Sequence, residues 1–309
     1  MTQTIHRPLL VTGAHRSGTS WIGKMLAAVG NFTYANEPLS VSHRSGVLGV
    51  DVKHWYAYII EENEAQYLSA FQDLIRLRYK FFKELSSLRS RKDVLRMGRD
   101  FFNFSYGRLH GNSVLLKDPF AAFSTPWFAD RLNCQVVISI RHPAAFASSL
   151  KRLNWPFQIH DLLEQPLLMR DYLEQDRAAL ESVQPDDIIG QASWLWKVLY
   201  CAIHQTLQTR SDLIAVRHED LSRDPVAGFR DLYQKLGFEF TPQVEHVVLN
   251  SSSSENPTEL SKKKVHSVKL DSRANLDNWK KRLTVEEIAR IRKITEDVSN
   301  LYYSDAEWD

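Results

Sequence analysis

The stretch Leu9–Gly30 reads LLVTGAHRSGTSWIGKMLAAVG, and it decides the fold. It opens with a short apolar run that has the length and composition of a buried strand. A turn from Gly13 to Ser20 follows, and apolar residues then recur at helical spacing until Gly30, which stands where a helix C-cap is expected. The stretch therefore predicts a strand, a tight loop and a helix.

The turn in this stretch resembles a phosphate-binding P-loop with one change. Gly13 and Gly18 have the P-loop spacing, but Thr19 occupies the lysine position and Ser20 follows it. Backbone N–H groups and the positive helix end can hold a phosphate, and Arg16 adds a fixed charge. Without the lysine, the loop suits one 5′-phosphate and its substituent better than a triphosphate with Mg²⁺. The alternative is that the glycines serve only the geometry of the turn.

Composition excludes few classes of protein. The 309 residues are 43% apolar and 25% charged, which is typical of a globular chain, and we expect a single domain over residues 1–309. Because 39 basic residues nearly balance 37 acidic ones, the net charge gives no argument for a nucleic-acid partner. The dense basic residues from Arg76 to Arg99 are interpreted as a solvated helical face rather than a nucleic-acid patch.

The cysteines and the apolar runs indicate the cellular compartment in which we expect the protein. Cys134 and Cys201 are far apart and have no metal-ligand spacing, so we expect neither a disulfide framework nor a metal site. No apolar run approaches membrane-spanning length, and the first residues lack the apolar region of a signal peptide. These features predict a cytoplasmic protein without an integral membrane segment.

Further strands and helices alternate along the chain. This order predicts an α/β fold: a parallel sheet with helices on both faces. Insertions at about 40–110 and 154–190 are too long for simple connections, and we expect them to cover the substrate side. The predicted strands are 31–35, 113–116, 134–140 and 213–216. The predicted helices are 55–104, 144–153, 188–208, 229–236 and 284–302, and 251–264 is expected to be a mobile loop.

Two motifs together resemble a known family. The loop Gly13–Trp21 is similar to the 5′-phosphosulfate loop of sulfotransferases that use 3′-phosphoadenosine 5′-phosphosulfate (PAPS). The segment Ile138–Pro143, with Ser148 and Ser149 one helical stretch later, resembles that family's 3′-phosphate motif. The segment Val216–Leu221 resembles the strand end near the adenine. Arg273 with Asn278-Trp279-Lys280 resembles the closing segment at the C-terminal end, and most of the chain is covered in the family's order.

The resemblance implies PAPS as the sulfuryl donor and adenosine 3′,5′-bisphosphate (PAP) as the product, with no metal. Arg141 and Ser149 would converge on the 3′-phosphate, and Trp21 would stack on the adenine. Lys262–Lys264 resemble the family's basic segment over the 3′-phosphate, although such a run is usually only solvated. The candidate donor-binding residues are His15, Arg16, Ser17, Gly18, Thr19, Ser20, Trp21, Arg141, Ser149, His218, Ser272 and Arg273.

The candidate catalytic residues are Arg16, Glu37, Lys117 and Asp118. Arg16 and Lys117 would stabilise charge on the departing phosphate oxygen. Glu37, in Asn36-Glu37-Pro38, resembles the base of carbohydrate-type sulfotransferases, and its alternative is a loop carboxylate in a salt bridge. Pro119 stands where the small-molecule branch has its histidine, so Asp118 is the second candidate base.

These inferences predict transfer of a sulfuryl group to a hydroxyl or amine of a glycan or small-molecule acceptor. The first alternative is a P-loop nucleotide kinase, against which Thr19 argues. The second is a non-catalytic nucleotide-binding protein of the same fold.

Overall fold

The computed structural model describes residues 6–259 and 269–309, and it contains one five-stranded parallel sheet in the order β2-β3-β1-β4-β5. The α/β fold with a parallel sheet is the one that the sequence predicts. Lys262–Lys264 lie outside the described residues. The strands are β1 (Leu9–Gly13), β2 (Phe32–Asn36), β3 (Ser113–Lys117), β4 (Gln135–Ile140) and β5 (Leu213–Arg217).

The register of the strands brings the sequence motifs to one edge of the sheet. Central strand β1 is buried throughout, as its apolar run predicts. Gly13 pairs with Ser139 of β4, and Asn36 of β2 pairs with Lys117 of β3. Because parallel strands end at the same edge, the loops that follow them lie side by side at their carboxyl ends, where open α/β sheets bind ligands.

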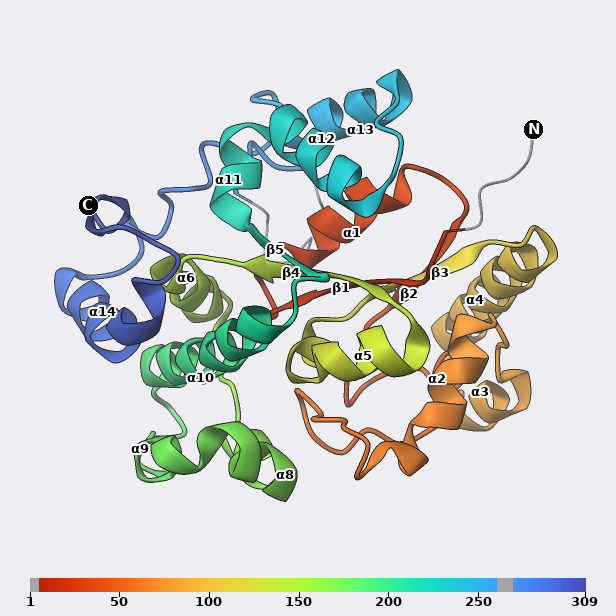
Figure 1. Cartoon of the computed structure of the whole chain (residues 1–309), viewed down its shortest axis with the longest axis horizontal. Helices are drawn as coiled ribbons and strands as arrows, with labels where there is room; N and C mark the ends of the chain where they lie inside the picture. The colour runs from red at the N-terminus through yellow and green to blue at the C-terminus, as the bar shows by residue number, and fades with distance from the viewer. Residues whose placement is uncertain (1–5, 260–268) are drawn as a thin grey trace.

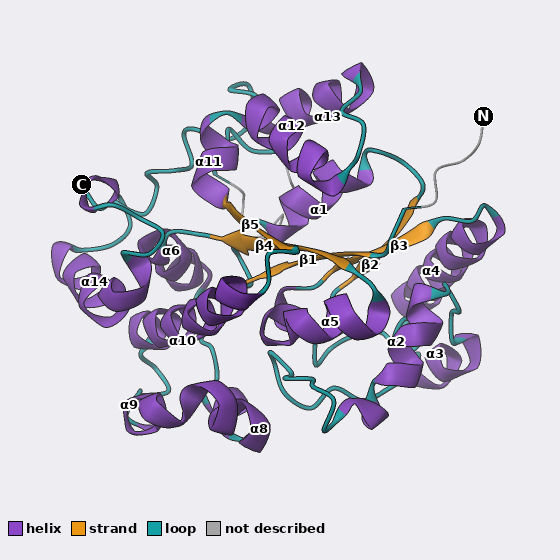
Figure 2. Ribbon diagram, viewed as in Figure 1, coloured by secondary structure: helices purple, strands orange, loops and turns teal. Residues whose placement is uncertain are grey.

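Helices cover both faces of the sheet, as Figure 1 and Figure 2 show. Their apolar sides pack on the sheet in two buried clusters, one on each face. One face carries α1 (Thr19–Ala27), α11 (His218–Arg223), α12 (Pro225–Leu236) and α13 (Pro242–Ser252). The other face carries α2 (Leu68–Ile75), α5 (Thr125–Leu132), α6 (Pro143–Leu153), α10 (Ile188–Thr209) and α14 (Val285–Ser299).

The single helix predicted over 55–104 is wrong. The chain from Trp55 to Asn63 is irregular, and three separate helices follow: α2, α3 (Phe81–Ser87) and α4 (Arg91–Leu109). Tyr56 and Leu77 have positive φ angles of 58° and 53°, which a helix cannot contain. Apolar spacing alone does not reveal such breaks.

Short helical segments make up the rest of the regular structure. Each insertion brings one tryptophan to the cavity described below, Trp55 from the first and Trp155 from the second. Among the described residues, none of the helices has the length and apolar character needed to span a membrane. The short segments are Glu64–Gln66, Pro119–Ser124, α7 (His160–Leu163), α8 (Pro166–Leu168), Met169–Leu173, Glu174–Asp176, α9 (Arg177–Glu181) and Asp305–Glu307.

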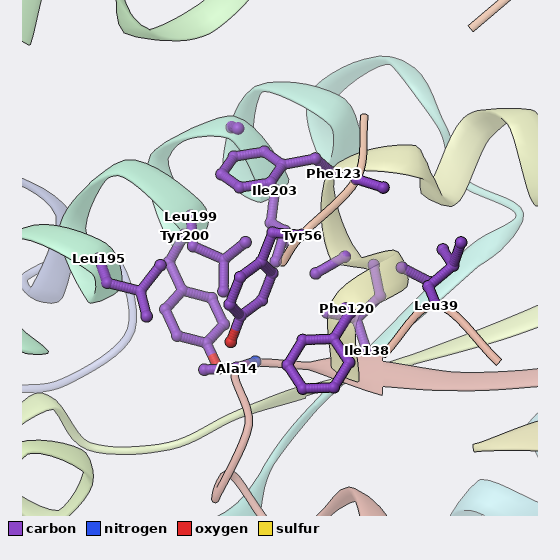
Figure 3. Close-up of a cluster of buried hydrophobic side chains, with 14 of the residues drawn as sticks. Ala14, Leu39, Tyr56, Phe120, Phe123, Ile138, Leu195, Leu199, Tyr200 and Ile203 are labelled. Carbon is purple, nitrogen blue, oxygen red and sulfur yellow. The ribbon is translucent and has the colours of Figure 1, made fainter. Parts of the chain in front are cut away.

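Two tyrosines of the buried core hold the start of the first loop (Figure 3). The Tyr200 hydroxyl accepts from the Ala14 amide at 3.2 Å and donates to the Ser139 carbonyl at 2.9 Å. The Tyr56 hydroxyl accepts from the His15 amide at 2.9 Å. Both side chains are fully buried, so the loop leaves β1 in a fixed direction.

Candidate functional site

Glycines set the shape of the first loop. Gly13 has a φ of 134°, and a Cβ atom there would lie 2.2 Å from the Ser139 carbonyl oxygen. Gly18 has a φ of 93°, and its Cβ would lie 2.5 Å from His218 Nδ1. Both positions therefore require glycine, for backbone angle and for space.

The loop ends at a helix N-terminus that can hold an anion. Gly18 is the N-cap of α1 and has no side-chain cap, and the amides of Thr19 and Ser20 have no partner within the helix. Ser17 turns the chain: its amide donates to Ala14 O at 3.0 Å and its carbonyl accepts from Ser139 Oγ at 2.6 Å. The positive helix end and the amides of the first turn therefore face the end of β1.

The second sequence motif meets this loop directly. Arg141 follows β4, and its Nη1 donates to the Arg16 carbonyl at 2.6 Å. Arg16 Nε in turn donates to Ser149 Oγ on α6 at 3.3 Å. Two candidate anion-binding segments that are 125 residues apart in the sequence thus form one continuous surface.

A cavity of about 320 Å³ lies beside this surface. Most of the predicted donor-binding residues line it. From the first loop and α1 they are His15, Arg16, Gly18, Thr19, Ser20 and Trp21. From later segments they are Arg141, Ser149, His218 and Ser272, and the candidate base Glu37 lines the cavity as well.

The cavity is a site of concentrated positive charge. Burial lowers the pKa of Arg16 to about 10, and the nearby charges of Arg141 and Arg152 act in the same direction, whereas Glu37 opposes them. Burial also lowers the pKa of Arg141, although Glu219 opposes this. Arg141 Nε is buried and has no hydrogen-bond partner among the described residues. These guanidinium groups fit a multiply charged anion.

Two arginines of the cavity were missed by the sequence analysis. Arg152 and Arg282 both line it, and Glu259 bridges them at 3.2 Å and 2.7 Å. Arg152 lies three residues after Ser149 on α6, so helical spacing could have placed it on the same face. Arg282 lies two residues after the motif that ends at Lys280, in a stretch without the helical or strand spacing that would predict its direction.

The candidate base is held by a buried lysine. Glu37 has a positive φ of 51°, and its carboxylate forms an ion pair with Lys117 Nζ. The Lys117 side chain is only 1% exposed, whereas that of Glu37 is 28% exposed. Both interpretations of Glu37 therefore describe its position: it is a salt-bridged carboxylate, and it lines the cavity.

Asp118, the second candidate base, is a buried carboxylate that holds backbone amides in place. It is fully buried, and its carboxylate accepts from the amides of Leu39 at 2.5 Å and Phe120 at 3.0 Å. Burial raises its pKa to about 7. It does not line the cavity, and it ties the segment after Glu37 to the end of β3.

Three further candidates also lie off the cavity wall. Ser17 and Lys117 are buried behind it, and the Arg273 guanidinium donates to the Arg223 carbonyl at 2.7 Å on the surface. Trp279 stacks on His142 with ring centroids 5.2 Å apart, and both line a separate cavity of about 130 Å³. The predicted closing residues Arg273, Asn278, Trp279 and Lys280 do not line the main cavity, whereas their neighbours Ser272 and Asn275 do.

Aromatic and histidine side chains enclose the cavity. Trp21 makes an edge contact with His218 at 5.7 Å and donates its indole N–H to Ser251 Oγ at 2.9 Å. His15 Nδ1 lies 2.7 Å from the Tyr56 hydroxyl oxygen. Burial lowers the pKa of both His15 and His218 to about 3, with a nearby arginine as the second cause, so both rings are neutral at pH 7.

Comparison with known proteins identifies the family. A family model described as "Sulfotransferase family" matches residues 8–242, and the chain therefore belongs to the sulfotransferase family. Among the described residues, no group of three or more His, Cys, Asp or Glu side chains is arranged to hold a metal. A search of curated proteins found no match.

Solved structures similar to this chain carry the same description. The "Sulfotransferase Domain from the Curacin Biosynthetic Pathway" has 17% identity and a TM-score of 0.47, with 98% of this chain and 99% of that chain covered. The "Sulfotransferase Domain from the Synechococcus PCC 7002 Olefin Synthase" has 15% identity and a TM-score of 0.45, with 99% and 98% covered. Mouse sulfotransferase SULT7A1, complexed with PAP, has 10% identity and a TM-score of 0.44, with 98% and 86% covered.

Proposed function

We propose that this protein transfers the sulfuryl group of PAPS to a hydroxyl or amine of a glycan or small-molecule acceptor. One observation carries the proposal. Residues of the loop 13–20 line the same cavity as Arg141 and Ser149, and hydrogen bonds join the two segments. A donor with phosphates at both its 5′ and 3′ positions suits such a pair of adjoining cationic segments.

The residues divide between the two ends of the donor. The amides of Thr19 and Ser20 and the guanidinium of Arg16 would hold the 5′-phosphosulfate, while Arg141 and Ser149 would hold the 3′-phosphate. Trp21 and His218 would flank the adenine, since both line the cavity beside the first turn of α1. Arg152 and Arg282 add charge to the same wall.

Bound PAPS would supply the sulfuryl group. The hydroxyl or amine of the acceptor would take the place of the 5′-phosphate on the sulfur atom. Glu37 would accept the acceptor's proton, because it is the carboxylate that reaches the cavity from the end of β2. Lys117 would act as a positioning residue, because its buried ammonium pairs with the Glu37 carboxylate and fixes where that carboxylate lies. Arg16 and the amides of the first turn would stabilise the negative charge that the departing phosphate gains.

The part of the cavity wall formed by the two insertions and by the short helix Pro119–Ser124 is aromatic. Trp55 and Phe120 make an edge contact with ring centroids 4.6 Å apart, and Trp155 lies 5.9 Å from Trp55. All three line the cavity with Glu37. Indole rings stack on the apolar faces of sugars and of aromatic rings, so either acceptor suits this wall.

Calorimetry with PAP and with ATP tests the donor class. PAP titrated in the presence of EDTA should bind with micromolar affinity. ATP titrated in a separate experiment with Mg²⁺ should bind at least about tenfold more weakly, because the loop lacks the P-loop lysine. Tighter, Mg²⁺-dependent binding of ATP would replace the proposal with the kinase. Transfer of ³⁵S from labelled PAPS to a panel of sugars, phenols and amines tests catalysis. PAP binding without transfer to any of them would favour the non-catalytic alternative.

A further inference from the structure

The helices α3 and α4 carry an unusual concentration of exposed apolar side chains. Eight of the twelve large apolar side chains that are exposed in the described chain lie between Phe82 and Leu109. The most exposed are Leu109 at 84%, Phe82 at 83%, Leu95 at 75% and Phe102 at 69%. Single exposed apolar residues are common, but a cluster of this size indicates an interaction surface.

Four of the exposed side chains form a stripe on the solvent face of α4. Leu95, Phe102, Tyr106 and Leu109 are spaced by seven, four and three residues, which places them on one side of a helix. Met97, Phe104 and Gly107 are the buried residues of α4, and they lie on its opposite side. The core therefore uses one face of α4 and leaves a second apolar face uncovered among the described residues.

Aromatic contacts join α3 to α4 and link residues within the stripe. Phe81 makes edge contacts with Phe82 at 5.8 Å and with Phe101 at 5.4 Å, and Phe102 stacks on Tyr106 at 6.1 Å. We use the name α3–α4 surface for six of these exposed apolar residues: Phe82, Leu85, Leu95, Phe102, Tyr106 and Leu109. Figure 1 shows α3 and α4 at the edge of the molecule opposite α14.

The same segment is strongly basic. Residues 76–110 contain ten lysines and arginines and three acidic residues, although the whole chain has a net charge of only +2. The three acids are already paired: Glu84 with Arg44, Asp93 with Arg96, and Asp100 with Arg99. Exposed Arg89, Arg91, Lys92 and Arg108 have no ion pair within the described ranges.

We propose that the α3–α4 surface binds an anionic phospholipid bilayer. Exposed apolar side chains flanked by lysines and arginines match the interface of a membrane with negative head groups, where the apolar groups insert and the cations contact phosphate. A second copy of the chain on this face would oppose like charge to like charge. A solvated helical face accounts for the cations but leaves the exposed phenylalanines and leucines without a role.

The binding is independent of the proposed chemistry, because it needs neither donor nor acceptor. It is measured by cosedimentation of the whole protein with phosphatidylcholine vesicles that contain 0 or about 30% phosphatidylserine. The protein should bind the anionic vesicles and hardly bind the neutral ones. Raising the salt concentration should weaken binding, since the cations act through a screened field. Equal binding to both vesicles, or none to either, would overturn the proposal.

Paired substitutions locate the surface. Leu95→Ser should lower the vesicle partition coefficient by about tenfold. Lys92→Glu should lower it by about fivefold or more, since each basic residue near an anionic surface contributes about fivefold. The matched controls lie on α14: Val285→Ser changes a side chain that is 77% exposed, and Lys293→Glu reverses an exposed charge.

Both controls should bind as the unchanged protein does. Binding that survives Leu95→Ser and Lys92→Glu, or that falls equally in the controls, would overturn the assignment to this surface. Circular dichroism checks that the variants are folded. Concentration-dependent dimerisation that Leu95→Ser abolishes, without any vesicle binding, would assign the surface to a second copy instead.

Discussion

Replacing Arg141 with alanine should weaken binding of PAP much more than binding of adenosine 5′-monophosphate (AMP). These two nucleotides differ only in the 3′-phosphate, which is the group assigned to Arg141 and Ser149. The Arg141 side chain also supports the first loop, because its Nη1 donates to the Arg16 carbonyl at 2.6 Å. Loss of that support should affect both nucleotides alike, so the ratio of the two affinities isolates the contact with the 3′-phosphate.

The structure sets the size of the effect. The Arg141 guanidinium is buried enough to lower its pKa, and its Nε has no partner within the described residues. A hydrogen bond to a charged group contributes about 1.5–3 kcal/mol. The PAP-to-AMP affinity ratio should therefore fall by about 10- to 150-fold in Arg141→Ala.

Isothermal titration calorimetry with each nucleotide measures this ratio. Arg217→Ala is the matched control, because Arg217 ends the neighbouring strand β5 but pairs with Glu307 and does not line the cavity. That variant should leave the ratio unchanged. If Arg141→Ala weakens PAP and AMP by the same factor, Arg141 does not bind the 3′-phosphate and the division of the cavity is wrong.

Three further predictions test the base, the loop and the buried histidine. Glu37→Gln should lower turnover by about 10²–10⁴-fold with little change in PAP affinity, and turnover within threefold of the unchanged enzyme would exclude Glu37 as the base. Gly13→Ala should cost about 2–5 kcal/mol of unfolding free energy in urea, because its Cβ would lie 2.2 Å from a carbonyl oxygen; Gly98→Ala, with nothing within 4 Å, is the control and should stabilise α4 slightly. Burial lowers the pKa of His142 to about 3, so the unfolded chain gains a proton there that the folded chain does not, and stability falls as the pH drops below about 6.5. His142→Phe should remove about 1.4 kcal/mol of this loss per pH unit. If the free energies of unfolding of the two proteins change in parallel between pH 7 and 5, this prediction is contradicted.

Local sequence patterns were enough for the strands and for the two candidate phosphate motifs, whose binding role stays a prediction. Apolar runs such as Leu9–Val11 and 134–140 specify buried strands, because a parallel sheet covered on both faces admits apolar residues at nearly every position. The spacing of Gly13 and Gly18 likewise predicts a tight loop before α1. The last predicted helix, over 284–302, corresponds to α14, which begins with a capping box at Thr284.

Other features depended on contacts that the sequence does not encode locally. The helix predicted over 55–104 breaks at residues with positive φ, and one of them, Tyr56, is fixed by packing in the core. Arg152 and Arg282 reach the cavity from α6 and from a turn before α14, and no spacing relates them to each other. Their joint charge exists only once the chain is folded.

By itself the sequence determined a parallel α/β sheet, a tight glycine loop at the end of its first strand, for which we propose phosphate binding, and a second cationic segment after Ile140. These follow from periodicity and glycine spacing, which act over a few residues. Tertiary structure alone decided that Glu37 reaches the cavity while Asp118 is sealed behind it, and that Lys117 is buried beneath the carboxylate it holds. Burial and ion pairing are set by which segments meet at the sheet edge, and that depends on the packing of the whole chain.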